Sequence, residues 1–169
     1  MKKINLYPFD SQFKKIKVRA SIKKDQRRIH CTWELVGLAL KAKRKLGARR
    51  DELWKGNVFE FFLKKIGEKK YYEIHLDELL NWNIYQLSHY RSELLESDEV
   101  FIEKADIFSV KENSVINLSL QFTEHNFSQN EWLFLCSVIW KTDNTFQYFS
   151  SSHPMDKPDF HMSKYYVKL

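Results

Sequence analysis

Three polar side chains, Glu60, Glu73 and His75, interrupt runs of residues that otherwise have the apolar character of β-strands. Glu60 lies in NVFEFFL (57–63), and Glu73 and His75 lie in YYEIHL (71–76). Because alternate residues of a strand project from the same face, Glu73 and His75 are predicted to be neighbours on one face of a sheet. If the two runs pair, Glu60 lies near Glu73 on that face.

Aromatic residues accompany these polar positions, namely Trp54, Tyr71 and Tyr85. Sugar hydroxyl groups need hydrogen-bond donors and acceptors, and the C–H face of a pyranose stacks on an aromatic ring. The combination of carboxylates, imidazole and aromatic rings therefore suits sugar binding. The alternative is that the polar groups simply face water, as one face of an antiparallel sheet often does.

The C-terminal segment SSSHPMDKPDFHM (150–162) places two histidines, two aspartates and two prolines close together. Prolines stiffen a loop and can hold such side chains in place. His153, Asp159 and His161 are therefore further candidates for ligand binding, and their types also permit a metal site. The alternative is that they cap a turn through hydrogen bonds.

Catalytic motifs are missing from the sequence, which has no GxSxG, P-loop, HExxH or GxGxxG pattern. Paired carboxylates permit glycoside hydrolysis with Glu60 and Glu73 as acid and base, but nothing in the sequence requires it. Cys136 lies in an apolar run and is interpreted as a core residue rather than a nucleophile. We therefore expect a binding module with no catalytic residues, no metal and no resident cofactor.

The elements that must position these residues show strict alternation of apolar and polar residues, which is typical of strands. The alternating runs are 15–22, 29–35, 57–63, 71–76, 114–122, 146–150 and 165–169. The run 132–140 is apolar on both faces and is predicted to be a central buried strand that forms a hairpin with 146–150 across the turn 141–145. Short spacing between the runs predicts an antiparallel sandwich or barrel, formed as one domain over residues 1–169.

Two stretches lack this alternation. Residues 78–97 have apolar side chains at helical spacing, so periodicity alone predicts a helix over part of that stretch. The basic stretch 41–56 shows no periodicity and is predicted to be a long loop between strands.

The composition excludes several classes of protein. With 43% hydrophobic and 15% aromatic residues among 169, the chain can bury a core, which excludes intrinsic disorder for most of it. Four Gly and three Pro exclude a collagen-like chain, and two Cys exclude a disulfide-dense scaffold. Cys31 and Cys136 could form one bridge or remain buried thiols in a reducing compartment. No signal peptide or membrane-length apolar run is present, so a cytoplasmic location is expected.

Positive charge is concentrated in the first 50 residues, which hold 16 Lys and Arg against three acidic residues. The remaining residues hold 12 basic and 19 acidic side chains, so the net charge of +6 is the sum of +13 and −7. The basic runs KKDQRR (23–28) and KAKRKLGARR (41–50) permit a nucleic-acid or protein interaction module. The alternative is that they are solvated loops and outward strand faces.

Motifs along residues 49–91 resemble the signature of DOMON-like domains related to family 9 carbohydrate-binding modules. That signature reads R-x-D-x-L-W, C-F-E, Y-L-E-F-N, a Ser-Pro-Ser-Gly turn, a Trp, a Tyr and Y-R. Here it falls on Arg49 or Arg50 with Asp51, Leu53-Trp54, Phe59-Glu60, Tyr71 and Glu73, Trp82 and Tyr85, and Tyr90-Arg91. The C-terminal HPMDKPDFHM also resembles the H-P-x-x-K-P-D-F-H terminus of the family.

The resemblance implies an all-β, immunoglobulin-like antiparallel β-sandwich of about ten strands. It also implies that residues 82–87 form a strand rather than a helix. By analogy with the sugar-binding modules, a carbohydrate or similar small molecule would rest on one sheet face between aromatic rings. The implied ligand-binding residues are Trp54, Glu60, Glu73, His75, Tyr85, Arg91, His153, Asp159 and His161.

The sequence departs from the family pattern at four places, at two of which Val58 replaces the Cys before Phe-Glu and Phe149 replaces a Trp. His75 stands where the family has Asn, and Asp77-Glu78-Leu79-Leu80 replaces the Ser-Pro-Ser-Gly turn. Related domains also bind haem, which would need axial ligands such as His75, His89, His153 or Met155. Haem binding is therefore an alternative to sugar binding.

Overall fold

The computed structural model describes residues 1–169 except 12, 14, 124–126, 128–130 and 143–144. The described residues form twelve β-strands, two short 3₁₀ turns and no α-helix. The strands are β1 (Lys2–Pro8), β2 (Lys17–Asp25), β3 (Arg28–Val36), β4 (Val58–Lys65), β5 (Tyr71–Asp77), β6 (Trp82–Leu87), β7 (Leu95–Glu96), β8 (Val100–Val110), β9 (Asn113–Phe122), β10 (Trp132–Thr142), β11 (Thr145–Ser150) and β12 (Val167–Lys168). The 3₁₀ turns are η1 (Leu53–Lys55) and η3 (Ser163–Tyr165). No helix of the described residues has the length and apolar character needed to cross a membrane.

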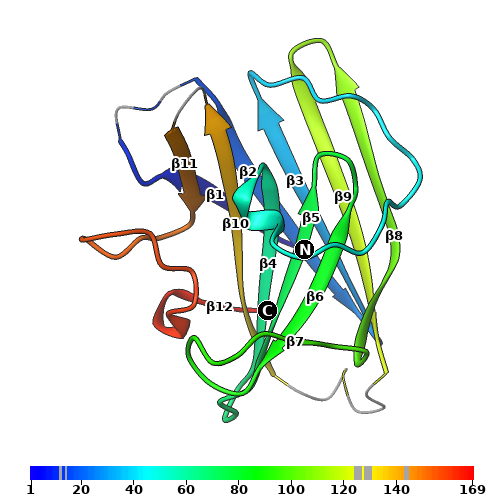
Figure 1. The fold of residues 1–169 in the computed structure, drawn as a ribbon, viewed down its shortest axis with the longest axis vertical. Coiled ribbons are helices and arrows are strands. Elements are labelled where there is room, and N and C mark those ends of the chain that lie inside the picture. The colour runs from blue at the N-terminus through cyan, green and yellow to red at the C-terminus, as the bar shows by residue number, and fades with distance from the viewer. Residues whose placement is uncertain (12, 14, 124–126, 128–130, 143–144) are drawn as a thin grey trace.

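The strands form two layers that face each other (Figure 1). One layer has the order β1-β2-β3-β9-β8, and the other has the order β7-β6-β5-β4-β10-β11, with β12 paired to β10. Strand β1 belongs to both, because its first residues pair with β2 and its last two pair with β11. Every pair between strands is antiparallel, so the predicted antiparallel β-sandwich is confirmed.

The main core lies between the two layers and follows from the alternation in the sequence. Along β3, the apolar side chains from Ile29 to Leu35 are buried while the intervening ones are more exposed. Aromatic side chains fill much of this space: Trp33 packs against Phe59 at 5.8 Å between ring centroids, and Phe61 stacks on Phe134 at 6.1 Å. Burial of these large rings supplies the hydrophobic driving force that holds the layers together.

The layer that contains β4, β5 and β10 is buried on both faces. A second apolar cluster covers its outer face and is formed by Val58, Phe62, Tyr71, Tyr85, Leu87, Leu135, Ile139, Phe160 and Tyr166. The C-terminal segment (residues 151–166) contributes Phe160 and Tyr166 to this cover, and Trp54 of η1 packs against it. The alternative that the polar residues of β4 and β5 face water is therefore wrong.

Residues 82–87 form strand β6, as the resemblance implied, so the helix suggested by periodicity is wrong. The preceding turn is closed by Asp77, whose Oδ1 accepts hydrogen bonds from the backbone amides of Leu79 and Asn81. Leu80 adopts a left-handed conformation with a φ of 62° and a fully buried side chain. A side-chain carboxylate thus stabilises the turn in which the family pattern has small residues.

The structure bears on three further predictions: the long loop, the hairpin and the two cysteines. Residues 37–57 connect β3 to β4 as a long loop, with isolated bridges at Lys43 and Arg49 and the turn η1. Strand β10 is central and pairs with β11 as a hairpin, but residues 143–144 of its turn lie outside the described residues. Cys31 and Cys136 are free, buried thiols with their sulfur atoms 3.6 Å apart.

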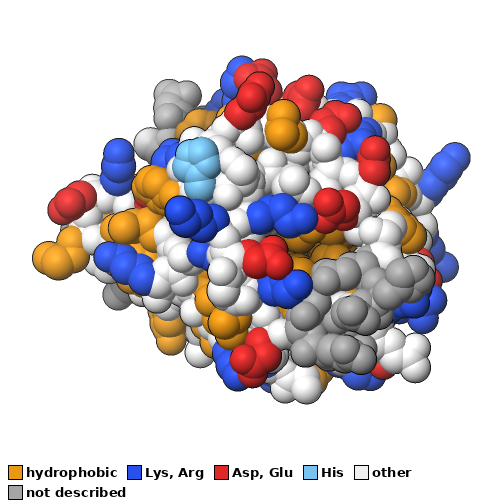
Figure 2. All heavy atoms as spheres, turned by 90° about the horizontal axis from the view of Figure 1, so that it is seen from below, with side chains coloured by type: hydrophobic (Ala, Val, Ile, Leu, Met, Phe, Trp, Pro, Cys, Tyr) orange, Lys and Arg blue, Asp and Glu red, His pale blue; other side chains and the backbone are white. Residues whose placement is uncertain are grey.

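Basic and acidic side chains are mixed on at least one face of the molecule. Figure 2 shows one end of the sandwich, where the Lys and Arg side chains of the described residues are interspersed with Asp and Glu side chains. The mixed charge of this end does not test the nucleic-acid alternative, which stays a prediction.

Candidate functional site

Strands β10, β4, β5 and β6 bring four polar residues into one row across the sheet. Ser137 pairs with Glu60, Glu60 with His75, and His75 with Asn83. In the next row on the same face, Glu73 lies between Phe62 and Tyr85. Glu60 and Glu73 are therefore diagonal neighbours, as expected if the two runs of the sequence pair.

His75 lies between the two carboxylates. Its Nε2 atom is 2.7 Å from Oε1 of Glu73 and 3.4 Å from Oε1 of Glu60. The other oxygen of Glu60 accepts a hydrogen bond of 2.7 Å from the Ser137 hydroxyl. All three charged side chains are buried, with 2% of Glu60, 5% of Glu73 and none of His75 exposed. We call Glu60, Glu73 and His75 the central triad.

Burial and mutual charge set the protonation of the central triad. Burial raises the pKa of Glu60 to about 7, although the charge of His75 opposes it. Burial alone would also raise the pKa of Glu73, but the hydrogen bond and charge of His75 outweigh it and lower that pKa. For His75, burial acts to lower the pKa, and the hydrogen bond and charge of Glu73 raise it above the ordinary value. The charged forms of Glu73 and His75 therefore stabilise each other.

Trp54 lies over the central triad from the turn η1. Its ring centroid is 5.6 Å from that of His75 and 6.0 Å from that of Tyr85. Asp51 fixes this turn, because its Oδ1 accepts hydrogen bonds from the Tyr85 hydroxyl and from Nδ2 of Asn83. The motif that joins Asp51 to Trp54 in the sequence thus anchors an aromatic ring above the sheet.

Arg49 also holds this loop. Nε of Arg49 donates to Oδ1 of Asn83, and the guanidinium lies over the Trp82 ring at 5.2 Å. It also forms ion pairs with Glu96 and Asp98. Of the two arginines considered for the motif, Arg49 therefore makes the contacts that position the loop.

The C-terminal segment brings Asp159 and His161 to the same face. Asp159 accepts a hydrogen bond of 2.5 Å from the Tyr90 hydroxyl and one from the backbone amide of His161, and lies 3.3 Å from Arg91. His161 places Nδ1 2.7 Å from the Tyr71 hydroxyl and 3.8 Å from Oε2 of Glu73. Burial lowers the pKa of His161, which favours the neutral ring. The segment is thus tied both to the loop after β6 and to β5.

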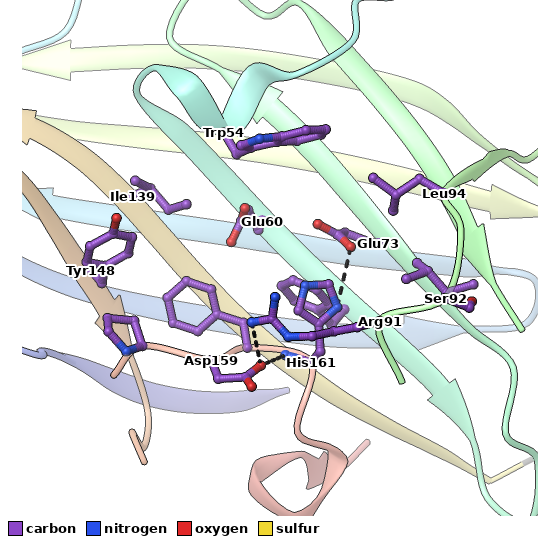
Figure 3. Close-up of a pocket in the computed structure, with 14 residues that line it drawn as sticks. Trp54, Glu60, Glu73, Arg91, Ser92, Leu94, Ile139, Tyr148, Asp159 and His161 are labelled. Carbon is purple, nitrogen blue, oxygen red and sulfur yellow. Dashed lines mark hydrogen bonds and ion pairs between the residues drawn. The ribbon is translucent and has the colours of Figure 1, made fainter. Parts of the chain in front are cut away.

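A cavity of about 430 Å³ opens among these elements (Figure 3). Carboxylates of Glu60, Glu73 and Asp159 border it together with Arg91 and Trp54, and the remaining lining is mostly apolar. The apolar and other lining residues are Phe62, Leu87, Ser92, Leu94, Ile139, Tyr148, Pro158, Phe160 and His161. The cavity therefore combines aromatic rings with charged groups of both signs.

Six of the nine candidate residues from the sequence line this cavity: Trp54, Glu60, Glu73, Arg91, Asp159 and His161. His75 and Tyr85 do not line it but pack against Trp54. His153 lies elsewhere, with Nε2 hydrogen-bonded to the Tyr7 carbonyl oxygen at 2.8 Å and its ring beside Phe9. Among the described residues, the metal-type cluster is the central triad, not His153, Asp159 and His161.

Two histidines that the sequence offered as haem ligands, His75 and His153, each have their Nε2 atom in a hydrogen bond. Nε2 of His75 is engaged by Glu73, and Nε2 of His153 is engaged by the Tyr7 carbonyl. Met155 is 98% exposed.

Several contacts were not predicted from the sequence. Ser137 was included only in an apolar run, although it is a polar residue fully buried in the middle of β10. Tyr90 was noted only as the partner of Arg91 in a motif, and its hydroxyl holds Asp159. A polar residue inside an apolar strand was the available sign for Ser137, but sequence alone gives no partner for Tyr90.

Comparisons with known proteins support the fold. No protein-family profile matches the chain, and no curated protein matches it. A candidate carbohydrate-binding protein from Bacteroides uniformis has a similar structure, with a TM-score of 0.66, 14% identity and coverage of 98% of this chain and 85% of that one. A family 9 carbohydrate-binding module from Caldicellulosiruptor kristjanssonii, solved with glucose, has a TM-score of 0.53, 7% identity and coverage of 98% and 82%. The chain therefore shares the β-sandwich fold seen in a family 9 module.

Proposed function

We propose that this protein is a non-enzymatic carbohydrate-binding module whose ligand occupies the cavity over β4 and β5. The observation that carries the proposal is that aromatic rings and charged groups of both signs line a single cavity of about 430 Å³. Pockets for small ligands fall in the range of about 300–1,000 Å³ and combine apolar walls with a few placed polar groups.

The chemistry of the lining suits a sugar. The Trp54 ring offers a surface for the C–H face of a pyranose. The carboxylates of Glu60, Glu73 and Asp159 accept hydrogen bonds from sugar hydroxyls, and Arg91 donates to sugar oxygens. Charged partners strengthen such hydrogen bonds about twofold relative to neutral ones.

The arrangement of the two glutamates supports binding over hydrolysis. Glycoside hydrolysis uses an acid and a second carboxylate that flank the scissile bond. Here both carboxylates share His75 as a partner on one sheet face. They therefore contact a ligand from the same side.

The structural neighbours support the same reading. One is described as a candidate carbohydrate-binding protein, and the other is a family 9 module with glucose. Together with the motifs of residues 49–91, they support the proposal that the chain is a DOMON-like relative of family 9 modules.

Isothermal titration calorimetry with a panel of mono- and disaccharides tests the proposal. At least one sugar should bind with one site per chain, and Trp54→Ala should reduce that affinity at least tenfold. Phe101→Ala, which removes an exposed aromatic ring from β8 on the other layer, serves as the control and should bind as the wild type does. Absence of heat with every sugar, or equal loss in both variants, would contradict it.

A further inference from the structure

We propose that the central triad binds a divalent transition-metal ion, such as Zn²⁺, at the floor of the cavity. One donor atom from each of Glu60, Glu73 and His75 lies within 4.8 Å of the other two. Neighbouring strands in fixed register provide the three side chains, because Glu60 is paired with His75 across β4 and β5.

The ligand types select the class of ion. Imidazole nitrogen favours Zn²⁺ and its neighbours in the first transition series, and carboxylate oxygen is compatible with them. Ca²⁺ takes six to eight oxygen ligands, whereas this cluster offers two carboxylates and one nitrogen. The donor set therefore fits an ion of intermediate hardness, such as Zn²⁺, better than a hard ion, such as Ca²⁺.

An unpartnered atom points to a ligand at this place. Oε2 of Glu73 is buried and accepts no hydrogen bond, and Nδ1 of His161 lies 3.8 Å from it. Glu73 is 5% exposed and lines the cavity, into which Figure 3 shows its side chain projecting. A buried carboxylate oxygen without a donor is costly, and coordination to a cation removes that cost.

Charge balance supports the same conclusion. The central triad contains two buried carboxylates and one imidazole, so a single imidazolium cannot neutralise both carboxylates when they are ionised. Buried charges are normally paired or coordinate metals. A divalent ion with neutral His75 neutralises the two carboxylates completely.

The cavity supplies access and room for further ligands. Glu60 and Glu73 border a space of about 430 Å³ that a hydrated ion can enter. Zinc sites with three protein ligands keep a position for water or for an oxygen of a bound molecule. If the proposed function holds, a sugar hydroxyl can take that position. Binding of the ion itself does not depend on the proposed function.

Calorimetry with ZnCl₂ alone tests the site on protein freed of metal with a chelator and then dialysed. One ion should bind per chain, and the heat should change with the ionisation enthalpy of the buffer because Nε2 of His75 must lose its proton. CaCl₂ at the same concentration should not displace Zn²⁺. Absence of Zn²⁺ binding overturns the inference.

Variants locate the bound ion. His75→Asn should weaken Zn²⁺ binding by at least about 100-fold, which is the upper end of the loss caused by removing a supporting contact at a metal site. His89→Asn, which changes an exposed histidine in the loop after β6, should keep the wild-type affinity. Equal affinity of the His75→Asn variant and the wild type overturns the inference, because it places the ion elsewhere.

Two measurements keep the test valid if His75→Asn does not fold. Glu60→Gln keeps the shape of the side chain and should also lose Zn²⁺ affinity. Co²⁺ should develop visible absorption bands on binding to the wild type, and Zn²⁺ should abolish them by displacement. Sugar titrations with and without Zn²⁺ separate this inference from the proposed function, since either binding event can fail alone.

Discussion

The Trp54 indole stands edge-on to the His75 ring, with the centroids 5.6 Å apart and the planes inclined by 72°. This contact joins the loop between β3 and β4 to the centre of β5. The turn η1 is thus a part of the site and not only a connection.

Trp54→Ala should lower the free energy of unfolding by about 1–3 kcal/mol. Complete truncation of a buried aromatic residue costs about 3–5 kcal/mol, and Trp54 is half-buried. Trp54→Phe keeps a ring over His75 and should lose less than half as much. Urea unfolding followed by circular dichroism measures both values. The exposed Phe101 provides the control, and Phe101→Ala should stay within about 0.5 kcal/mol of the wild type.

Gly47→Ala should destabilise the fold by about 1–3 kcal/mol, the usual cost of overpacking. A Cβ atom at this position would lie 2.7 Å from Oδ1 of Asn81 and 2.9 Å from its backbone nitrogen. The backbone amide of Gly47 donates to the Leu80 carbonyl oxygen, so the loop cannot simply move away without losing that hydrogen bond.

Gly56→Ala is the matched control for Gly47→Ala. The nearest atom to its added Cβ is 3.7 Å away, which is ordinary contact. This variant should therefore keep the wild-type stability or gain up to about 1 kcal/mol through the less flexible unfolded chain. Equal melting temperatures for the two variants would show that the loop does not approach Leu80 and Asn81, in the turn before β6, this closely.

The fold was predictable because most strands have one face toward the main core. Alternation therefore located β2, β3, β5 and β9 closely. Strand β8 was missed, and a bulge between Ile102 and Lys104 shifts its alternation there. Strand β6 was not evident from periodicity alone because its two faces are both largely buried, so apolar residues do not alternate.

The site was predictable only in part. The shared face of Glu73 and His75 follows from their spacing of two residues on one strand. The position of Asp159 depends on how a segment without regular structure crosses the sheet, and its partner Tyr90 lies 69 residues away in sequence. No local pattern encodes such a contact. The resemblance at the C-terminus indicated Asp159 and His161, but it did not separate them from His153.

Asp159→Asn should loosen the C-terminal segment, and its effect should depend on pH. Burial alone would raise the pKa of Asp159, but the hydrogen bonds from Tyr90 and from the His161 amide and the charge of Arg91 lower it below the ordinary 3.8. A carboxylate with a lowered pKa stabilises the fold above its unfolded-state pKa and loses that contribution as the pH falls through the folded value. The wild type should therefore melt above the variant at pH 7, and the difference should shrink below about pH 4.

Thermal melting between pH 7 and pH 2 checks this prediction, with limited proteolysis at pH 7 as a second measurement. Cleavage within residues 151–166 should be faster in Asp159→Asn than in the wild type. Asp156→Asn changes an exposed carboxylate of the same segment and should leave both measurements unchanged. A difference in melting temperature that persists undiminished to pH 2 would show that the charge of Asp159 is not its cause.

Cys31 and Cys136 should resist thiol reagents in the native protein. Both side chains are buried between the layers, and burial raises the pKa of Cys31 well above the ordinary value of a thiol. Because thiolate is the reactive form, modification should require unfolding or a large opening of the sandwich.

Ellman's reagent should therefore detect almost no thiol at first in the native protein and two thiols per chain in denaturant. Glu112→Cys adds a thiol at an exposed turn and should react at once, which shows that the reagent is active. Rapid reaction of a thiol in the wild type would mean that the two layers separate more readily than their aromatic packing predicts.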